Sequence, residues 1–147
     1  MGIKPERVIY IEEEIAYWRK ANAIHAWFVE NCQDGRDECQ TAYVSRDQLE
    51  DLLLAVNAVL DGAVTVPGDV HNGTSWEGDG KHEHYEPGEV ILNQEMADEL
   101  LPTRSGFFFG GTDYDHYYLE GLRYTKERLE GLLKEDNLGE LYYHASW

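Results

Sequence analysis

Apolar side chains recur at helical spacing near the start of the chain. When successive residues are placed about 100° apart, one side of residues 10–32 becomes an apolar stripe. The stripe consists of Ile11, Ile15, Trp18, Val29 and Cys32, with Phe28 at its border. We therefore predict a first helix from about residue 10 to residue 32, ended by the Asp34-Gly35 pair.

The clearest helix signal begins at Ser45. Ser45 and Gln48 have the spacing of a capping box, in which each side chain bonds the backbone N–H of the other residue, and Val44 can pack against Leu49. Asp61-Gly62 ends the pattern. The apolar face consists of Leu49, Leu52, Leu53, Val56, Val59 and Leu60. We predict that this helix belongs to the core and carries no chemistry.

Residues 62–90 lose this periodicity. They contain six glycines and two prolines. We predict a long irregular excursion with at most a short strand at residues 64–66, and such excursions are usually functional or mobile. A short helix is expected at residues 93–101, because Pro102 cannot continue it.

The last third of the chain predicts a strand, a long helix and a closing strand. Residues 103–111 contain three successive phenylalanines and end in glycines, which is typical of a buried strand. Thr112 is placed to cap a helix that reaches about residue 134. Residues 140–147 are typical of a final strand that could pair with the phenylalanine run.

We therefore expect a predominantly helical α+β fold. Three to four helices would pack on a small antiparallel sheet containing the strands at 107–109 and 142–146. The length of 147 residues suits a single domain covering 1–147.

The charge balance excludes several classes of partner. The chain has 29 Asp and Glu against 12 Lys and Arg, a formal charge of −17. Nucleic acids and anionic lipids are bound mainly through basic side chains, so neither is an expected partner. No run approaches the ~20 apolar residues of a membrane span, and the N-terminus lacks the apolar core of a signal peptide. A small ligand in a local pocket and a basic protein partner remain, including a surface that imitates DNA.

Two polar residues interrupt the apolar stripe of the first predicted helix. Asn22 and His25 lie among Ile15, Trp18 and Val29. A buried polar group without a partner costs about 1–3 kcal/mol, so something must bond them. An internal network, for instance to tyrosine hydroxyls, is one interpretation, and a ligand pocket is the other. A catalytic histidine is not favoured, because no nucleophile or carboxylate pair stands at a recognisable spacing from it.

Aromatic residues are dense between residues 103 and 124, and many tyrosine hydroxyls beside Arg104 and His25 would suit a planar, hydroxyl-rich ligand such as a nucleotide. An aromatic face of this kind is also typical of a core. Gly110-Gly111-Thr112 weakly resembles a backbone site that binds an anion at the start of a helix. The neighbouring Asp113 and Asp115 would repel an anion there. The candidate ligand-binding residues are Trp18, Asn22, His25, Arg104, Ser105, Phe107, Tyr114, Tyr117 and Tyr118.

The excursion also holds three histidines. His82 and His84 would lie on one side of a strand, which is a usable spacing for metal ligands, and His71 precedes them. A solvated loop is the alternative interpretation. Cys32 and Cys39 are too few for a structural zinc site and fit a reducing cytoplasm as thiols, with a disulfide as the alternative. No metal or cofactor is therefore predicted.

Three segments resemble the signature of a family of small uncharacterised proteins of tailed phages. They are YWRKANAIHAWFV at 17–29, LPTRSGFFFGGTDYD at 101–115 and YYHASW at 142–147. The resemblance implies a phage protein acting in the cytoplasm of an infected bacterium. It implies no established activity and no functional residues.

These observations favour a binding protein over an enzyme. Our leading hypothesis is a small nucleotide-like ligand held between the first helix and residues 104–118, with Arg104 pairing with phosphate and a homodimer as one arrangement. By analogy of type, such a protein would be a sponge for cyclic ADP-ribose-like or cyclic dinucleotide signals of bacterial immunity. The alternatives are an acidic, DNA-mimic inhibitor of a basic host protein, and a metal-dependent hydrolase built on His71, His82 and His84.

Overall fold

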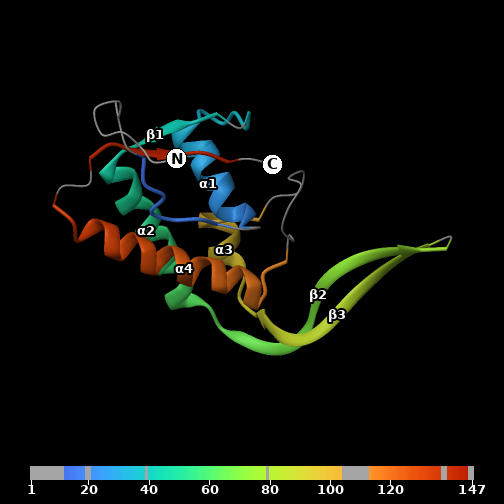
Figure 1. The fold of residues 1–147 in the computed structure, drawn as a ribbon. Coiled ribbons are helices and arrows are strands. Elements are labelled where there is room, and N and C mark those ends of the chain that lie inside the picture. The colour runs from blue at the N-terminus through green and yellow to red at the C-terminus, as the bar shows by residue number, and fades with distance from the viewer. Residues whose placement is uncertain are drawn as a thin grey trace, which may run out of the picture.

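The structure is a computed structural model that describes residues 12–18, 21–38, 40–78, 80–103, 113–136 and 139–145. These residues form four helices and two separate two-stranded antiparallel sheets, which confirms an α+β fold (Figure 1). The helices are α1 (Asn22–Cys32), α2 (Arg46–Gly62), α3 (Glu95–Leu100) and α4 (His116–Leu133). Strand β1 (Ala42–Val44) pairs with β4 (Leu141–Tyr143), and β2 (Thr65–Glu77) pairs with β3 (Gly80–Ile91).

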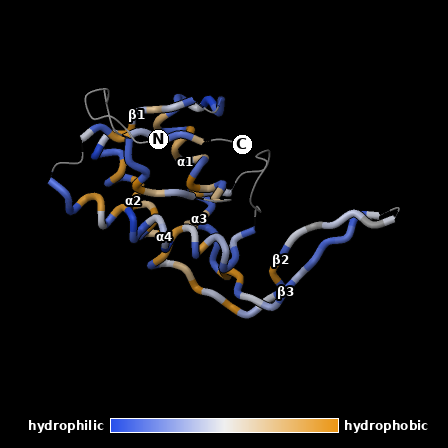
Figure 2. Tube along the Cα trace, in the orientation of Figure 1, coloured by the Kyte–Doolittle hydropathy of each residue, from blue (hydrophilic) through white to orange (hydrophobic). Residues whose placement is uncertain are grey.

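The core lies where α1, α2 and α4 meet. Its fully buried side chains include Ile24, Leu52, Val56, Leu122 and Leu129. Figure 2 shows apolar residues concentrated in this body, whereas the outer half of the β2–β3 ribbon is mainly hydrophilic. None of the described helices is long and apolar enough to cross a membrane.

Helix α2 begins and packs as its sequence predicts. Ser45 Oγ accepts from Gln48 N at 3.1 Å, and Ser45 N donates to Gln48 Oε1 at 2.9 Å. The short helix before Pro102 is also confirmed, as α3. In α2 local capping chemistry and helical periodicity agree, so no tertiary contact has to override them.

The prediction of one helix from residue 10 to residue 32 is wrong in its first half. Residues 12–18 are not helical, and α1 begins at Asn22. In one continuous helix Trp18 and Phe28 would stand about 15 Å apart along the axis. In the structure their ring centroids are 5.7 Å apart, so Trp18 packs against α1. Tertiary packing here overrides the helical spacing of the apolar residues.

The expected irregular excursion is a long β-hairpin, so that prediction is also wrong. Residues 65–91, hereafter the arm, run out from the body and return (Figure 1). The strand register shifts between His71 and Thr74, where Gly73 takes a φ of +105°, and Gly78 at the tip takes +59°. Glycine adopts both values without strain, so these glycines build a bulge and a turn instead of an irregular loop.

The last helix starts later than predicted. Asp115, not Thr112, caps α4, accepting from Tyr117 N at 3.0 Å and Tyr118 N at 3.2 Å. The closing strand is confirmed as β4, which pairs with β1 within the described part of the chain, with Ala42 opposite Tyr143. Thr112 and the predicted strand at 107–109 lie outside the described residues.

Candidate functional site

A groove of about 640 Å³ is bordered by residues 17, 18 and 21–24, by the start of α4 and by the bulge of the arm. This volume is within the range of ligand pockets, about 300–1,000 Å³. Four of the residues that the sequence singles out line it together: Trp18, Asn22, Tyr117 and Tyr118. The non-helical course of residues 12–18 makes this possible, because it brings Trp18 beside α4.

Trp18 is held in place by α4. Its indole Nε1 donates to Thr125 Oγ1 at 2.7 Å, and the fully buried Thr125 donates in turn to the Gly121 carbonyl at 2.7 Å. Its ring meets Tyr124 edge-on with centroids 6.0 Å apart. The indole N–H is therefore engaged inside the protein, and Trp18 offers the groove only its ring.

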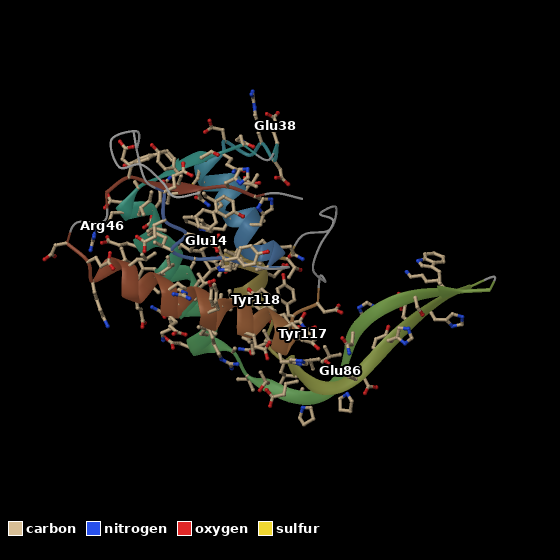
Figure 3. All side chains as sticks on the ribbon, viewed as in Figure 1. Glu14, Glu38, Arg46, Glu86, Tyr117 and Tyr118 are labelled. Carbon is tan, nitrogen blue, oxygen red and sulfur yellow. The ribbon has the colours of Figure 1, made fainter. Side chains whose placement is uncertain are left out.

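Three tyrosine hydroxyls of the groove are engaged as well. Tyr118 OH donates to the Leu101 carbonyl at 2.8 Å, Tyr117 OH donates to Glu86, and Tyr124 OH accepts from Tyr17 N at 2.9 Å. Burial raises the pKa of Tyr118, so its hydroxyl keeps its proton. Figure 3 shows Tyr117 and Glu86 where the arm meets α4. A ligand in the groove would meet aromatic rings more than free hydroxyl groups.

His25 belongs to an internal network and does not line the groove. Its Nδ1 lies 2.6 Å from Tyr143 OH, and its Nε2 lies 3.0 Å from Asp37 Oδ1. A carboxylate only accepts, so Nε2 donates to Asp37, and in the neutral ring Nδ1 then accepts from Tyr143. Burial raises the pKa of Tyr143, which keeps the donor protonated. Of the two interpretations of His25, the internal network fits this geometry; Asn22, 3% exposed, does line the groove.

The described lining of the groove is acidic. Asp113, Asp115 and Glu120 line it, and no Lys or Arg is among the described lining residues. Asp115 is 7% exposed and caps α4, and burial raises its pKa despite the two backbone N–H groups that it accepts from. Asp113 and Glu120 are exposed and make no hydrogen bond or ion pair with the described part of the chain. These two carboxylates are the ones available to a ligand.

A smaller hollow of about 290 Å³ has the opposite charge. Arg123 and Lys126 line it beside Leu60 and Ala63, at the C-terminal end of α2. The carbonyl end of a helix carries a partial negative charge that cations stabilise. We therefore assign these two cations a structural role at the end of α2.

The remaining predicted binding residues do not reach the groove or lie outside the described residues. Tyr114 does not line it: its ring packs 5.1 Å from Tyr118, and its hydroxyl donates to Asp98 at 3.0 Å. Burial raises its pKa. Arg104, Ser105 and Phe107, together with the glycine pair before Thr112, lie outside the described residues.

The three histidines of the arm do not form a metal site among the described residues, where no group of three or more His, Cys, Asp or Glu could hold an ion. The ring centroids of His71 and Tyr85 are 5.6 Å apart, and His84 Nε2 forms a hydrogen bond of 2.8 Å with Ser75 Oγ. Cys32 is a free thiol whose pKa burial raises to about 11, and Cys39 lies outside the described residues.

Several groove residues escaped the sequence analysis. Glu120 and Tyr124 stand three and seven positions after Tyr117, so helical spacing alone places them on its face of α4 and could have found them. Tyr17 and the arm residues 71–73 carry no such signal, because their place in the groove depends on a chain turn and a strand bulge.

Comparison of the chain with models of known protein families, with characterised proteins and with solved structures finds no significant match. The resemblance to tailed-phage proteins therefore stays a prediction. Function has to be inferred from the groove, its charge and the surrounding surface.

Proposed function

We propose that the protein binds a basic protein partner through the groove and the acidic surface around it. One observation carries this proposal: the described groove lining contains three carboxylates and neither a lysine nor an arginine. The formal charge of −17 acts in the same direction. A negative cleft attracts positively charged partners and repels phosphate groups. If the resemblance to phage proteins holds, the partner would be a host protein.

The arm extends the same acidic surface. It carries six acidic residues and one lysine, and it meets the body at the groove through residues 71–73. The acidic residues are Asp69, Glu77, Asp79, Glu83, Glu86 and Glu89. Complementary charge of this extent speeds association and selects against wrong partners.

The nucleotide-like ligand is the second candidate function. Its support is that Trp18, Asn22, Tyr117 and Tyr118 meet in one groove of suitable size. Aromatic rings would stack a base. A phosphate, however, would have to lie near Asp113 and Glu120, so this hypothesis, including the role as a sponge for immune signals, depends on a cation such as Arg104.

A carbodiimide crosslink followed by a salt titration tests the proposed function. Carbodiimide joins carboxylates directly to partner lysines, so crosslinked peptides identify both the partner and the contact. We expect the purified partner to bind at least about tenfold more weakly at 500 mM than at 50 mM NaCl, because screening shortens the reach of surface charge. Binding that ignores salt, together with tight binding of a nucleotide, would contradict the proposal and favour the second candidate.

Two double variants separate the groove from charge in general. Asp113→Asn with Glu120→Gln should weaken binding by about tenfold, whereas Asp51→Asn with Glu127→Gln should stay within about twofold. Both pairs remove two exposed negative charges, but only the first pair lines the groove. Equal losses would place the contact elsewhere on the acidic surface.

A further inference from the structure

We propose that the groove is a receptor for the guanidinium group of an arginine side chain on the partner, an inference that rests on the proposed function. The groove combines aromatic rings with two exposed carboxylates, Asp113 and Glu120. Guanidinium is the one common protein cation that both stacks on a ring and pairs with a carboxylate through a planar fork.

One face of α4 contributes aromatic rings and a glycine to the groove. Tyr117, Gly121 and Tyr124 follow one another along this face, and Tyr124 stands seven positions, or about 10.5 Å along the helix axis, after Tyr117. Gly121 lies between them without a side chain, and Ala21 packs against it, since a Cβ added there would meet Ala21 Cβ at 3.9 Å. A planar cation in the groove would therefore lie beside Ala21 and Gly121, which both line it.

Glu120 stands beside this part of the groove. It lies three positions after Tyr117 and four before Tyr124, so its carboxylate can reach a group held between the rings. Asp113 lines the groove near the N-terminal end of α4. Asp115 is not available in the same way, because it is buried and already accepts from Tyr117 N and Tyr118 N.

The engaged polar atoms favour a cation over a neutral hydrogen-bonding ligand. The Trp18 indole N–H and the hydroxyls of Tyr117 and Tyr118 all donate within the protein. The exposed parts of the aromatic rings that line the groove attract cations, because the face of a ring is negative. The protein already makes one such contact with a guanidinium of its own, since Arg128 lies 5.4 Å from the centroid of the Tyr124 ring.

Arginine fits this lining better than lysine. A lysine ammonium is a compact, strongly hydrated charge that needs three acceptors, whereas guanidinium is weakly hydrated and flat. Two free carboxylates and several rings match the second description. We therefore infer selectivity for arginine.

The test compares two peptides that differ in one group. The probe is Ac-Gly-Ser-Gly-Arg-Gly-Ser-Gly-NH2, and its control carries citrulline, which keeps the planar shape and length but has no charge. Titrations followed by ¹H–¹⁵N NMR should move the amide signals of α4 around Gly121 and the Trp18 indole signal. We expect the citrulline peptide to bind about tenfold more weakly, and a lysine peptide to bind at least about threefold more weakly.

Matched variants locate the binding. Glu120→Gln should weaken the arginine peptide about fivefold, while Glu127→Gln on the same helix should leave it within about twofold. Gly121→Leu should fill this part of the groove and abolish binding. Gly131→Leu should not, since nothing stands within 4 Å of that position. The NMR spectrum of each variant also reports whether it folds.

Equal binding of the arginine and citrulline peptides, or signals that move on another surface, would overturn the inference. A lysine peptide that binds as well as arginine would overturn the selectivity for guanidinium. If the partner still docks with steep salt dependence in any of these cases, the proposed function stands without an arginine receptor. If AMP moves the groove signals and the basic peptides do not, both proposals fail together.

Discussion

At the residue scale, Tyr143 joins two parts of the core. Its ring stacks on Phe28 with centroids 4.0 Å apart, and its hydroxyl donates to the buried His25. Tyr143→Phe keeps the stacking but leaves His25 Nδ1 without its donor. We expect the free energy of unfolding, measured in urea, to fall by about 1–3 kcal/mol, because a buried acceptor loses its hydrogen bond.

The neighbouring Tyr142→Phe is the matched control. Tyr142 is 59% exposed, and its hydroxyl donates to Glu140 at the surface. Its loss should change stability by no more than about 0.5 kcal/mol. If the two variants cost the same, the network around His25 contributes nothing specific. If Tyr143→Phe instead weakened groove binding at unchanged stability, the assignment of His25 to structure would be wrong.

At the residue scale, the sequence predicts some features of the site and not others. Asn22 and His25 were recognised as buried because polarity within an apolar stripe is a local signal. Their separate roles are not local: the partner of His25, Tyr143, lies 118 residues away in the chain. Only the fold decides which of two buried polar residues faces a groove. Aromatic spacing on α4, in contrast, puts Tyr117 and Tyr118 on one face because a helix fixes its own face, and both residues line the groove.

At the element scale, the arm is held by its root. Val90 pairs with Asp115, Ile91 N donates to the Tyr114 carbonyl at 3.0 Å, and His116 covers Gly88. A Cβ at Gly88 would stand 2.6 Å from the His116 ring and 2.8 Å from Val70 Cγ2. Gly88→Ala should therefore cost about 1–3 kcal/mol by overpacking and speed amide exchange in the arm.

Gly80→Ala, in the same strand near the tip, is the control for this prediction. Its nearest neighbour would be His82 Nε2 at 4.0 Å, so the added methyl group meets no obstacle. Amide exchange in the arm should then match that of the original protein within about twofold. Fast amide exchange in both variants would mean that the arm opens independently of its root, and that the contacts at the root do not hold the arm in place.

The same elements show where local signals suffice. Helix α2 was predictable because its cap, its apolar face and its end agree along 17 residues. Strand β1 has only three residues, and its pairing partner β4 lies nearly a hundred residues later in the chain. No local sequence pattern therefore predicts it. The arm was missed because glycine and proline usually break strands. In a two-stranded ribbon, outward positions need no backbone donor, so Pro67 and Pro87 are tolerated.

At the scale of the whole molecule, one property acts on stability and on binding with opposite signs. A formal charge of −17 repels itself within the folded body and attracts a basic partner outside it. Salt screens both effects. Raising NaCl from 10 to 150 mM should therefore stabilise the isolated protein, by about 1 kcal/mol or 2–4 °C in Tm, while it weakens the complex.

Thermal unfolding at several salt concentrations checks the first half of this prediction, and KCl at equal ionic strength should give the same curve. A larger effect of sodium sulfate at that ionic strength would report exclusion of the salt from the surface, not screening. A Tm that falls as NaCl is added would mean that attractive pairs outweigh repulsion in the folded state. The surface would then lack the field on which docking to a basic partner depends, because the same unbalanced carboxylates produce both the repulsion and the attraction.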